Sequence, residues 1–167
     1  RVFESQQVNP AFLRQIDVAV CPVTREVLTH GTGELSDASV DRVFNDAAYA
    51  AGNLAVMSTR ANRAKSAYGV DDAMGFVRQI EVGQLGQIDG LSAEHWARIA
   101  VLTSFATPMS HARAAKLPLL VLPPNRLRVL NPVQSLQVML SLQFTRAGRA
   151  RRCAALSGLM PSPQAKY

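Results

Sequence analysis

The acidic residues of this chain all lie in its first 94 positions, and this uneven distribution constrains how the rest of the chain can fold. Residues 1–94 contain twelve carboxylates and eight basic residues, a net charge of −4, whereas residues 95–167 contain ten basic residues and no acidic one, a net charge of +10. Such a basic surface suits a polyanion, since binding releases counterions from phosphates. A solubilising face, or a tail that docks on the acidic half of a neighbouring subunit, is the alternative.

Nucleic acid, with DNA favoured, is therefore the predicted partner, and a set of six arginines supplies the candidate phosphate contacts. They are Arg126, Arg128, Arg146, Arg149, Arg151 and Arg152. If the last four lie on a helix, its 3.6-residue turn places Arg146, Arg149 and Arg152 along one side. Guanidinium groups in such a row can follow a phosphate backbone.

The composition favours helices. Apolar residues make up 48% of the chain but aromatic residues only 6%, which is typical of helices that pack through small side chains. The predicted fold class is mainly α: a helical bundle or hairpin domain with a short extended apolar segment and a basic C-terminal helix. No apolar run approaches the roughly 20 residues that span a bilayer. We expect a soluble, cytoplasmic protein with no membrane contact.

Four regions follow from the composition along the chain. We expect an N-terminal segment over residues 1–35, a helical oligomerisation region over 36–108, a basic C-terminal region over 109–158 and a disordered tail over 159–167. Within the first region, residues 12–20 are apolar and could form either a helix or a strand, because periodicity alone does not decide between them.

The clearest helix is predicted over residues 36–68, where apolar residues recur at spacings of three and four: Val40, Val43, Phe44, Ala47, Ala51, Leu54 and Ala55. Many of them are small, and small residues let helices approach closely. We therefore expect a helix hairpin or a dimer seam on this face, and a homo-oligomer.

Two helical stretches are predicted next. Asp71 or Asp72 can cap a short helix that follows Gly69, since acidic residues suit the first turn. Leu85 and Ile88 are assigned to another short turn of helix.

Ser92 can cap a helix that ends near Pro108, although the capping-box glutamate is replaced by His95. Residues 117–124 are apolar but contain three prolines, which indicates an edge strand or an extended connector. Asn131 and Pro132 open a final long helix. Its apolar residues lie on more than one side, so we expect it to be well buried.

Residues 64–87 alternate helix and turn, and this rhythm loosely resembles helix-turn-helix units. Arg78, Gln79, Gln84 and Gln87 could then face base edges. A plain helical hairpin is the alternative for this segment.

A family resemblance lies in the same part of the chain, over residues 45–88. The residues that carry it are Asp46-Ala47-Ala48-Tyr49, Ala64, Gly69-Val70-Asp71-Asp72-Ala73-Met74 and Ile80-Glu81-Val82-Gly83-Gln84-Leu85-Gly86-Gln87-Ile88. This pattern resembles FlhD, the D subunit of the flagellar master transcription activator, in which a long helix beginning near a tyrosine leads to a turn and a second helix. The resemblance implies an all-helical dimer that activates transcription with a second regulatory subunit. The family's cysteine before a Phe-Arg-Phe run has no counterpart in this chain.

Signals of catalysis or metal binding are weak. The chain has no nucleophile-elbow, P-loop, dinucleotide-binding or zinc-protease motif. Cys21 and Cys153 lie far apart, and His30, His95 and His111 are scattered, which indicates packing and surface roles. We expect no enzyme activity, no metal and no cofactor.

Two functions fit these observations. The first is an oligomeric DNA-binding transcriptional regulator whose basic C-terminal half contacts phosphates. The second is a non-catalytic assembly protein, such as a secretion-apparatus component or a viral structural protein, whose basic half binds an acidic protein or packaged nucleic acid.

Overall fold

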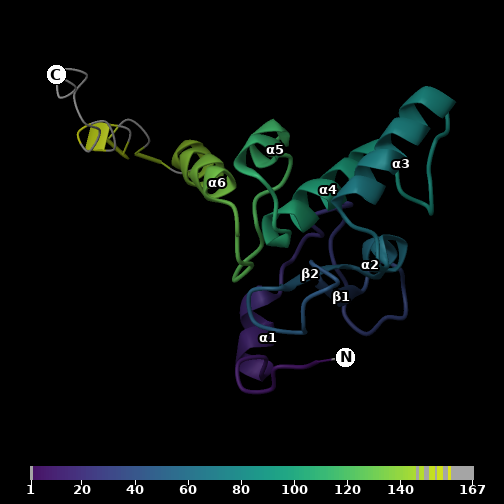
Figure 1. The fold of residues 1–167 in the computed structure, drawn as a ribbon. Helices are drawn as coiled ribbons and strands as arrows, with labels where there is room; N and C mark the ends of the chain where they lie inside the picture. The colour runs from purple at the N-terminus through teal and green to yellow at the C-terminus, as the bar shows by residue number, and fades with distance from the viewer. Residues whose placement is uncertain (1, 146, 149–150, 153, 156–157, 159–167) are drawn as a thin grey trace.

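The structure is a computed structural model that describes residues 2–145, 147–148, 151–152, 154–155 and 158. The chain forms six named helices, α1 to α6, and one small antiparallel sheet of two strands, β1 and β2 (Figure 1). The sheet and α1 lie below a helical hairpin made of α3 and α4, and α5 and α6 extend to one side. The predicted fold class, mainly α with a helical hairpin, is confirmed.

The predicted helix over residues 36–68 is wrong. These residues form β1 (Ala38–Arg42), a long loop, β2 (Leu54–Ser58) and the short helix α2 (Thr59–Lys65). Asn53 explains part of the difference, since its side chain accepts from the backbone of Phe44 at 2.9 Å and donates back to the Phe44 carbonyl at 3.0 Å. Such bonds compete with helix formation. Gly52 adds a positive φ of 92° that ends any helical run.

The expected seam therefore does not exist as a helix face. Ala47 and Ala51 lie in the loop and are half-buried, whereas Leu54 and Ala55 are buried in β2. Every residue of β2 is buried, so its sequence lacks the alternation of apolar and polar residues that is typical of a half-exposed strand.

The first apolar stretch, residues 12–20, is helical over residues 12–16, whereas Val20 forms an isolated antiparallel bridge with Val27. The helix is α1 (Pro10–Ile16), which begins at Asn9, whose side chain accepts from the backbone N–H of Phe12 at 3.0 Å. Phe12 and Ile16 are its buried residues, and the helix packs against β2.

A hairpin of α3 (Val70–Gly83) and α4 (Ala93–Ala106) contributes to a single hydrophobic core that also includes residues of α1, β2 and the connector before α6. Asp72 accepts from the backbone N–H of Gly69 at 2.9 Å, so one of the two predicted capping aspartates caps the helix, which is longer than expected. Leu85 and Ile88 lie in the loop after α3, and the predicted turn of helix there is wrong, because Gln84 adopts a left-handed conformation that ends α3.

The start of α4 agrees with the prediction. The Ser92 hydroxyl accepts from the backbone N–H of His95, and His95 Nδ1 accepts in return from the backbone N–H of Ser92, both at 3.4 Å. A histidine thus completes the capping box in place of glutamate. The helix ends at Ala106, close to the expected Pro108.

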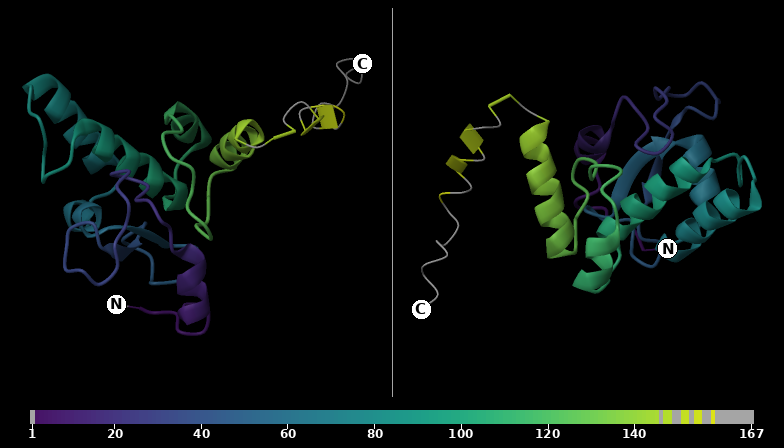
Figure 2. Two further views of the ribbon diagram at one scale, coloured as in Figure 1. Left: turned by 180° about the vertical axis from the view of Figure 1, so that it is seen from behind. Right: turned by 90° about the horizontal axis from the view of Figure 1, so that it is seen from above.

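The C-terminal part holds α5 (His111–Lys116), an extended connector over residues 117–131, and α6 (Pro132–Phe144). Asn131 caps α6 as predicted. The expectation that α6 is well buried is wrong: Gln134 is its one buried residue, and Leu136, Leu140 and Phe144 are 51%, 45% and 57% exposed. Figure 2 shows the reason, because α6 projects from the body, with α5 beside it, and among its described contacts with α4 is the hydrogen bond from Gln134 to Ser104 at 2.7 Å.

Candidate nucleic-acid interface

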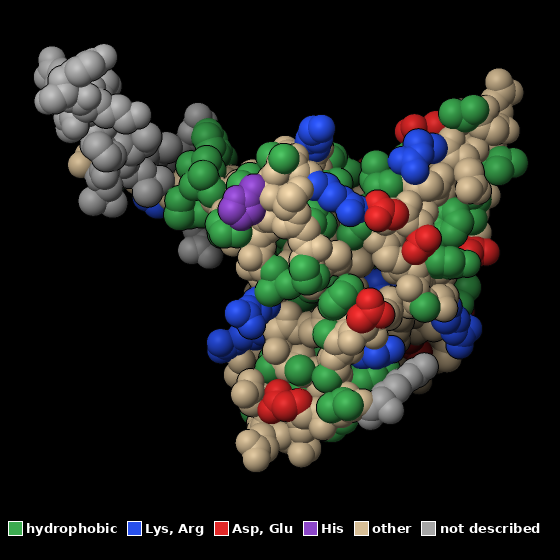
Figure 3. Space-filling view, viewed as in Figure 1, with side chains coloured by type: hydrophobic (Ala, Val, Ile, Leu, Met, Phe, Trp, Pro, Cys, Tyr) green, Lys and Arg blue, Asp and Glu red, His purple; other side chains and the backbone are tan. Residues whose placement is uncertain are grey.

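Two of the six predicted arginines lie together on the connector before α6. A turn closed by the Leu127 N–H on the Pro124 carbonyl, at 3.1 Å, places Arg126 in the left-handed region at φ 65°. Leu127 is buried and anchors the turn, while Arg126 and Arg128 on either side of it are exposed. Figure 3 shows Lys and Arg side chains gathered beside α1 at this edge of the molecule.

The connector is fixed to the loop before β2. Arg128 donates its backbone N–H to the Gly52 carbonyl at 2.9 Å. A Cβ on Gly52 would lie 3.2 Å from the Cβ of Arg128, and φ at Gly52 is +92°, so glycine permits this close approach. The two arginines are thus held at a defined place on the core rather than on a free tail.

Hollows open on both sides of this contact. One of about 360 Å³ is lined by Arg126 and by the side-chain amides of Gln7, Asn9 and Gln15. The other, of about 300 Å³, is lined by Arg128 and mostly apolar residues. No carboxylate lines either hollow, and among the described residues neither arginine lies within ion-pair distance of one.

The other four arginines are not brought to this place. Arg146 and Arg149 lie outside the described residues, so the predicted row of three is not tested. Arg151 is exposed beyond α6. Arg152 donates to the carbonyl oxygens of Gln143, at 3.1 Å, and Ala147, and therefore caps the C-terminal end of α6. Figure 2 shows this segment on the far side of α6 from the connector.

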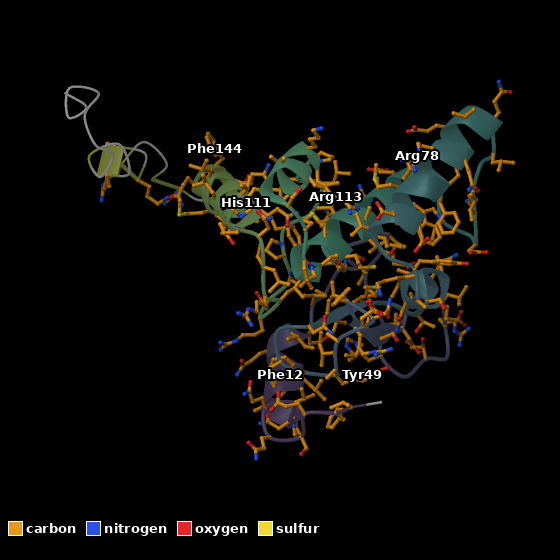
Figure 4. All side chains as sticks on the ribbon, viewed as in Figure 1. Phe12, Tyr49, Arg78, His111, Arg113 and Phe144 are labelled. Atoms are coloured by element: carbon orange, nitrogen blue, oxygen red, sulfur yellow. The ribbon has the colours of Figure 1, made fainter. Side chains whose placement is uncertain are left out.

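Two further cations of the basic half are paired with carboxylates at the surface of the molecule. Arg98 pairs with Glu94 and donates to the Val23 carbonyl at 3.0 Å. Arg113, labelled on α5 in Figure 4, pairs with Asp71 of α3. Carboxylates of the acidic half thus neutralise part of the charge of the basic half. The partner of Arg113 lies 42 positions earlier in the chain, so this pair could not be predicted from the sequence.

The helix-turn-helix interpretation gains little from the geometry. Arg78 and Gln79 are exposed on α3, but Gln84 and Gln87 follow its last residue and lie in the loop. Because α3 packs along α4, these residues belong to the plain helical hairpin that was the alternative.

A buried ion pair was missed by the sequence reasoning. Lys65 of α2 is fully buried, and its Nζ lies 3.1 Å from Asp41 Oδ1 and 2.9 Å from the Arg42 carbonyl. Burial raises the pKa of Asp41 to about 6, although the charge of Lys65 opposes that shift. The pair joins residues 24 positions apart, and no sequence motif marks it.

Next to this pair lies a polar hollow of about 310 Å³ between β1, the loop after it and the end of α2. The guanidinium carbon of Arg42 lies 4.7 Å from the ring centroid of Tyr49, and both residues line the hollow. Asn45 and Asn62 contribute side-chain amides. Tyr49 is labelled in Figure 4 near the N-terminal segment.

Few described residues have the features of a metal site, a reactive thiol or a membrane span. Within the described part of the chain, no three His, Cys, Asp or Glu side chains are grouped so as to hold a metal ion. Cys21 is buried, and its Sγ accepts from the backbone N–H groups of Ser58 and Thr24 at 3.3 and 3.4 Å. No helix among the described residues is long and apolar enough to cross a membrane.

Comparison with protein-family models, with curated proteins and with solved structures finds no match for this chain. The resemblance to FlhD stays a prediction. The resemblance implies a turn at residues 69–74 and a second helix over residues 80–88, whereas the structure has one helix over residues 70–83 and a loop after it. The long helix it implies near Tyr49 is replaced by a loop and β2.

Proposed function

We propose that this protein binds nucleic acid, DNA foremost, through the surface of Arg126 and Arg128, and that it regulates transcription as an oligomer. The observation that carries the proposal is the pair of exposed arginines, held on the core by Leu127 and Gly52 and without a carboxylate partner among the described residues. Arg151 and the segment beyond α6 supply additional charge. The FlhD resemblance suggests a second regulatory subunit as a further partner.

The hollow beside Arg126 supports contact with more than phosphate. Gln7, Asn9 and Gln15 line it. The Asn9 amide already caps α1, whereas the side-chain amides of Gln7 and Gln15 can hydrogen-bond both phosphate oxygens and base edges. Guanidinium groups would fix the register on the strand, while the amides would supply whatever sequence preference the site has. Without a carboxylate in its wall, the hollow does not repel a phosphate.

The test is DNA affinity against salt concentration, measured by fluorescence anisotropy with a labelled duplex. We expect the double variant Arg126→Ala, Arg128→Ala to weaken binding across sequences and to flatten the log–log salt slope by about 1.8, if each arginine neutralises one phosphate. The matched control is Arg25→Ala, Arg63→Ala, which removes two exposed arginines of the acidic half. Equal slopes for both variants and the wild type would contradict the proposal.

A second candidate function, a non-catalytic assembly protein, is favoured by α6. Its exposed side chains Leu136, Met139, Leu140 and Phe144 form an apolar surface, seen in green over α6 in Figure 3, and such surfaces mark interaction sites. Mass measurement of the native complex, combined with DNA affinity for different sequences, would separate the two candidates. Bound nucleic acid that the arginine variant loses, with an affinity that depends on the DNA sequence, supports a regulator. A protein assembly with unchanged DNA affinity in that variant, or nucleic acid bound without sequence preference, supports an assembly protein.

A further inference from the structure

The hollow beside Tyr49 has no role in the proposed interface, and its walls combine flat and polar groups. Arg42 Nη1 donates to the carbonyl oxygens of Asn45 at 2.9 Å and Ala47 at 3.3 Å, so the guanidinium is held in place over the Tyr49 ring. The ring of Phe3 also lies beside the Tyr49 ring, and the two ring centroids are 6.4 Å apart. Phe3 is 57% exposed, so this group of flat side chains reaches the surface.

The polar edge of the hollow is also fixed. Asn62 Nδ2 donates to Ser39 Oγ at 2.7 Å and to the Val40 carbonyl at 3.4 Å, which orients its amide. The carbonyl oxygen of that amide has no hydrogen-bond partner within the described part of the chain, and neither has the side-chain amide of Asn45. These amide groups can therefore bind a ligand without breaking a hydrogen bond within the described part of the protein.

Two charged residues, Asp41 and Arg42, line the hollow, and Lys65 lies behind Asp41. Asp41 and Lys65 neutralise each other, and their side chains are 5% and 0% exposed. Arg42 then leaves the lining with one net positive charge. A planar, uncharged ring with hydrogen-bonding edges, attached to a phosphate, matches flat walls, amide edges and a single positive charge.

We propose that this hollow binds one unpaired nucleobase of a DNA strand, stacked on Arg42 and Tyr49 and hydrogen-bonded at its edge by Asn45 and Asn62. This inference rests on the proposed function, since it assigns a second contact on the same nucleic acid. A base inside a duplex is stacked and paired and does not reach such a hollow, so the protein prefers single-stranded or locally melted DNA.

The experiment compares a labelled 15-nucleotide single strand with the duplex of the same sequence, using the full chain and fluorescence anisotropy. The variant Tyr49→Leu removes the stacking ring, and we expect single-strand affinity to fall about tenfold with duplex affinity unchanged. The matched control is Tyr68→Leu, which removes a ring that packs on Phe76, with centroids 4.9 Å apart, and that does not line the hollow; we expect it to leave both affinities unchanged. Arg42→Lys keeps the charge but loses the planar group, and it provides an independent variant if Tyr49→Leu does not fold.

The outcomes separate this inference from the proposed function. If Arg126→Ala, Arg128→Ala weakens both DNA forms while the Tyr49 and Arg42 variants weaken neither, the hollow is not a base site although the interface stands. If only the Tyr49 and Arg42 variants weaken binding, the hollow stands and the interface is wrong. Free deoxyadenosine monophosphate that binds as tightly as the 15-mer would overturn the assignment to a strand.

Discussion

The buried pair of Asp41 and Lys65 gives the sharpest prediction about stability. Lys65 Nζ donates to Asp41 Oδ1 and to the Arg42 carbonyl. It also lies 3.0 Å from Asp41 Oδ2, which accepts no hydrogen bond from any described residue, so that contact is Coulombic only. The variant Lys65→Met keeps the length of the side chain but leaves Asp41 buried without its cation.

Removing one partner of a buried pair typically costs about 3–5 kcal/mol, because the remaining charge is uncompensated. For a chain of this size that corresponds to a fall in melting temperature of roughly 6–20 °C. The double variant Asp41→Asn, Lys65→Met removes both charges, and we expect it to recover most of the loss. Circular dichroism melts of the three proteins measure both effects.

The pH dependence of the same pair gives an independent check with a definite sign. Burial raises the pKa of Asp41 from 3.8 to about 6, so the folded state holds this proton more tightly than the unfolded state. The contribution of Asp41 therefore becomes more stabilising as pH falls from 6 towards 3.8, by up to ~3 kcal/mol, and is constant below that range. The reasoning is refuted if Lys65→Met melts like the wild type, or if the double variant keeps the wild-type pH profile between pH 4 and 7.

Three further outcomes are expected. The pKa of Asp37 is lowered to about 2 by hydrogen bonds from Thr32 and Thr29, so it stabilises the fold above pH 3.8 and loses that contribution as pH falls towards 2; urea titrations of Asp37→Asn against the wild type should converge in that acid range. Gly52→Ala should cost about 1–2 kcal/mol, because φ there is +92° and the new Cβ meets Arg128, and the displaced Arg128 should also weaken DNA binding in anisotropy. The triple variant Arg149→Ala, Arg151→Ala, Arg152→Ala should flatten the salt slope of DNA binding by up to about 2.7, with circular dichroism unchanged apart from the last turn of α6, which loses its contact with Arg152; unchanged affinity would assign these residues to other contacts.

The parts of the fold that local chemistry determines were predictable from the sequence. Ser92 and the Asn131-Pro132 pair mark the starts of α4 and α6, because a cap acts on backbone groups only two or three residues away. The same reasoning failed over residues 36–68. There the apolar spacing suits a helix, but the side chain of Asn53 and the backbone of Gly52 close a loop, and β1 pairs with β2 across it.

The candidate site was predictable only in part, for a related reason. The lack of an ion-pair partner for Arg126 and Arg128 agrees with the absence of carboxylates nearby in the chain, and that signal is present in the sequence. Their surroundings are not, since Gln7 and Gln15 reach the same hollow from the other end of the chain. Arg113 shows the opposite case, because its partner Asp71 lies 42 residues earlier and no local pattern connects them.

The fold thus divides the arginines of the basic half into those paired with carboxylates and those without such a partner among the described residues. Where α4 and α5 approach acidic side chains, Arg98 and Arg113 are paired, and exposed ion pairs of this kind contribute little to stability. The connector before α6 has no such neighbour among the residues that the structure describes, so Arg126 and Arg128 keep their charge for a ligand. Counterion release acts on unpaired cations, and for this reason the salt slope should respond to this connector and not to α4 or α5. An equal loss of slope in Arg98→Ala would contradict that division.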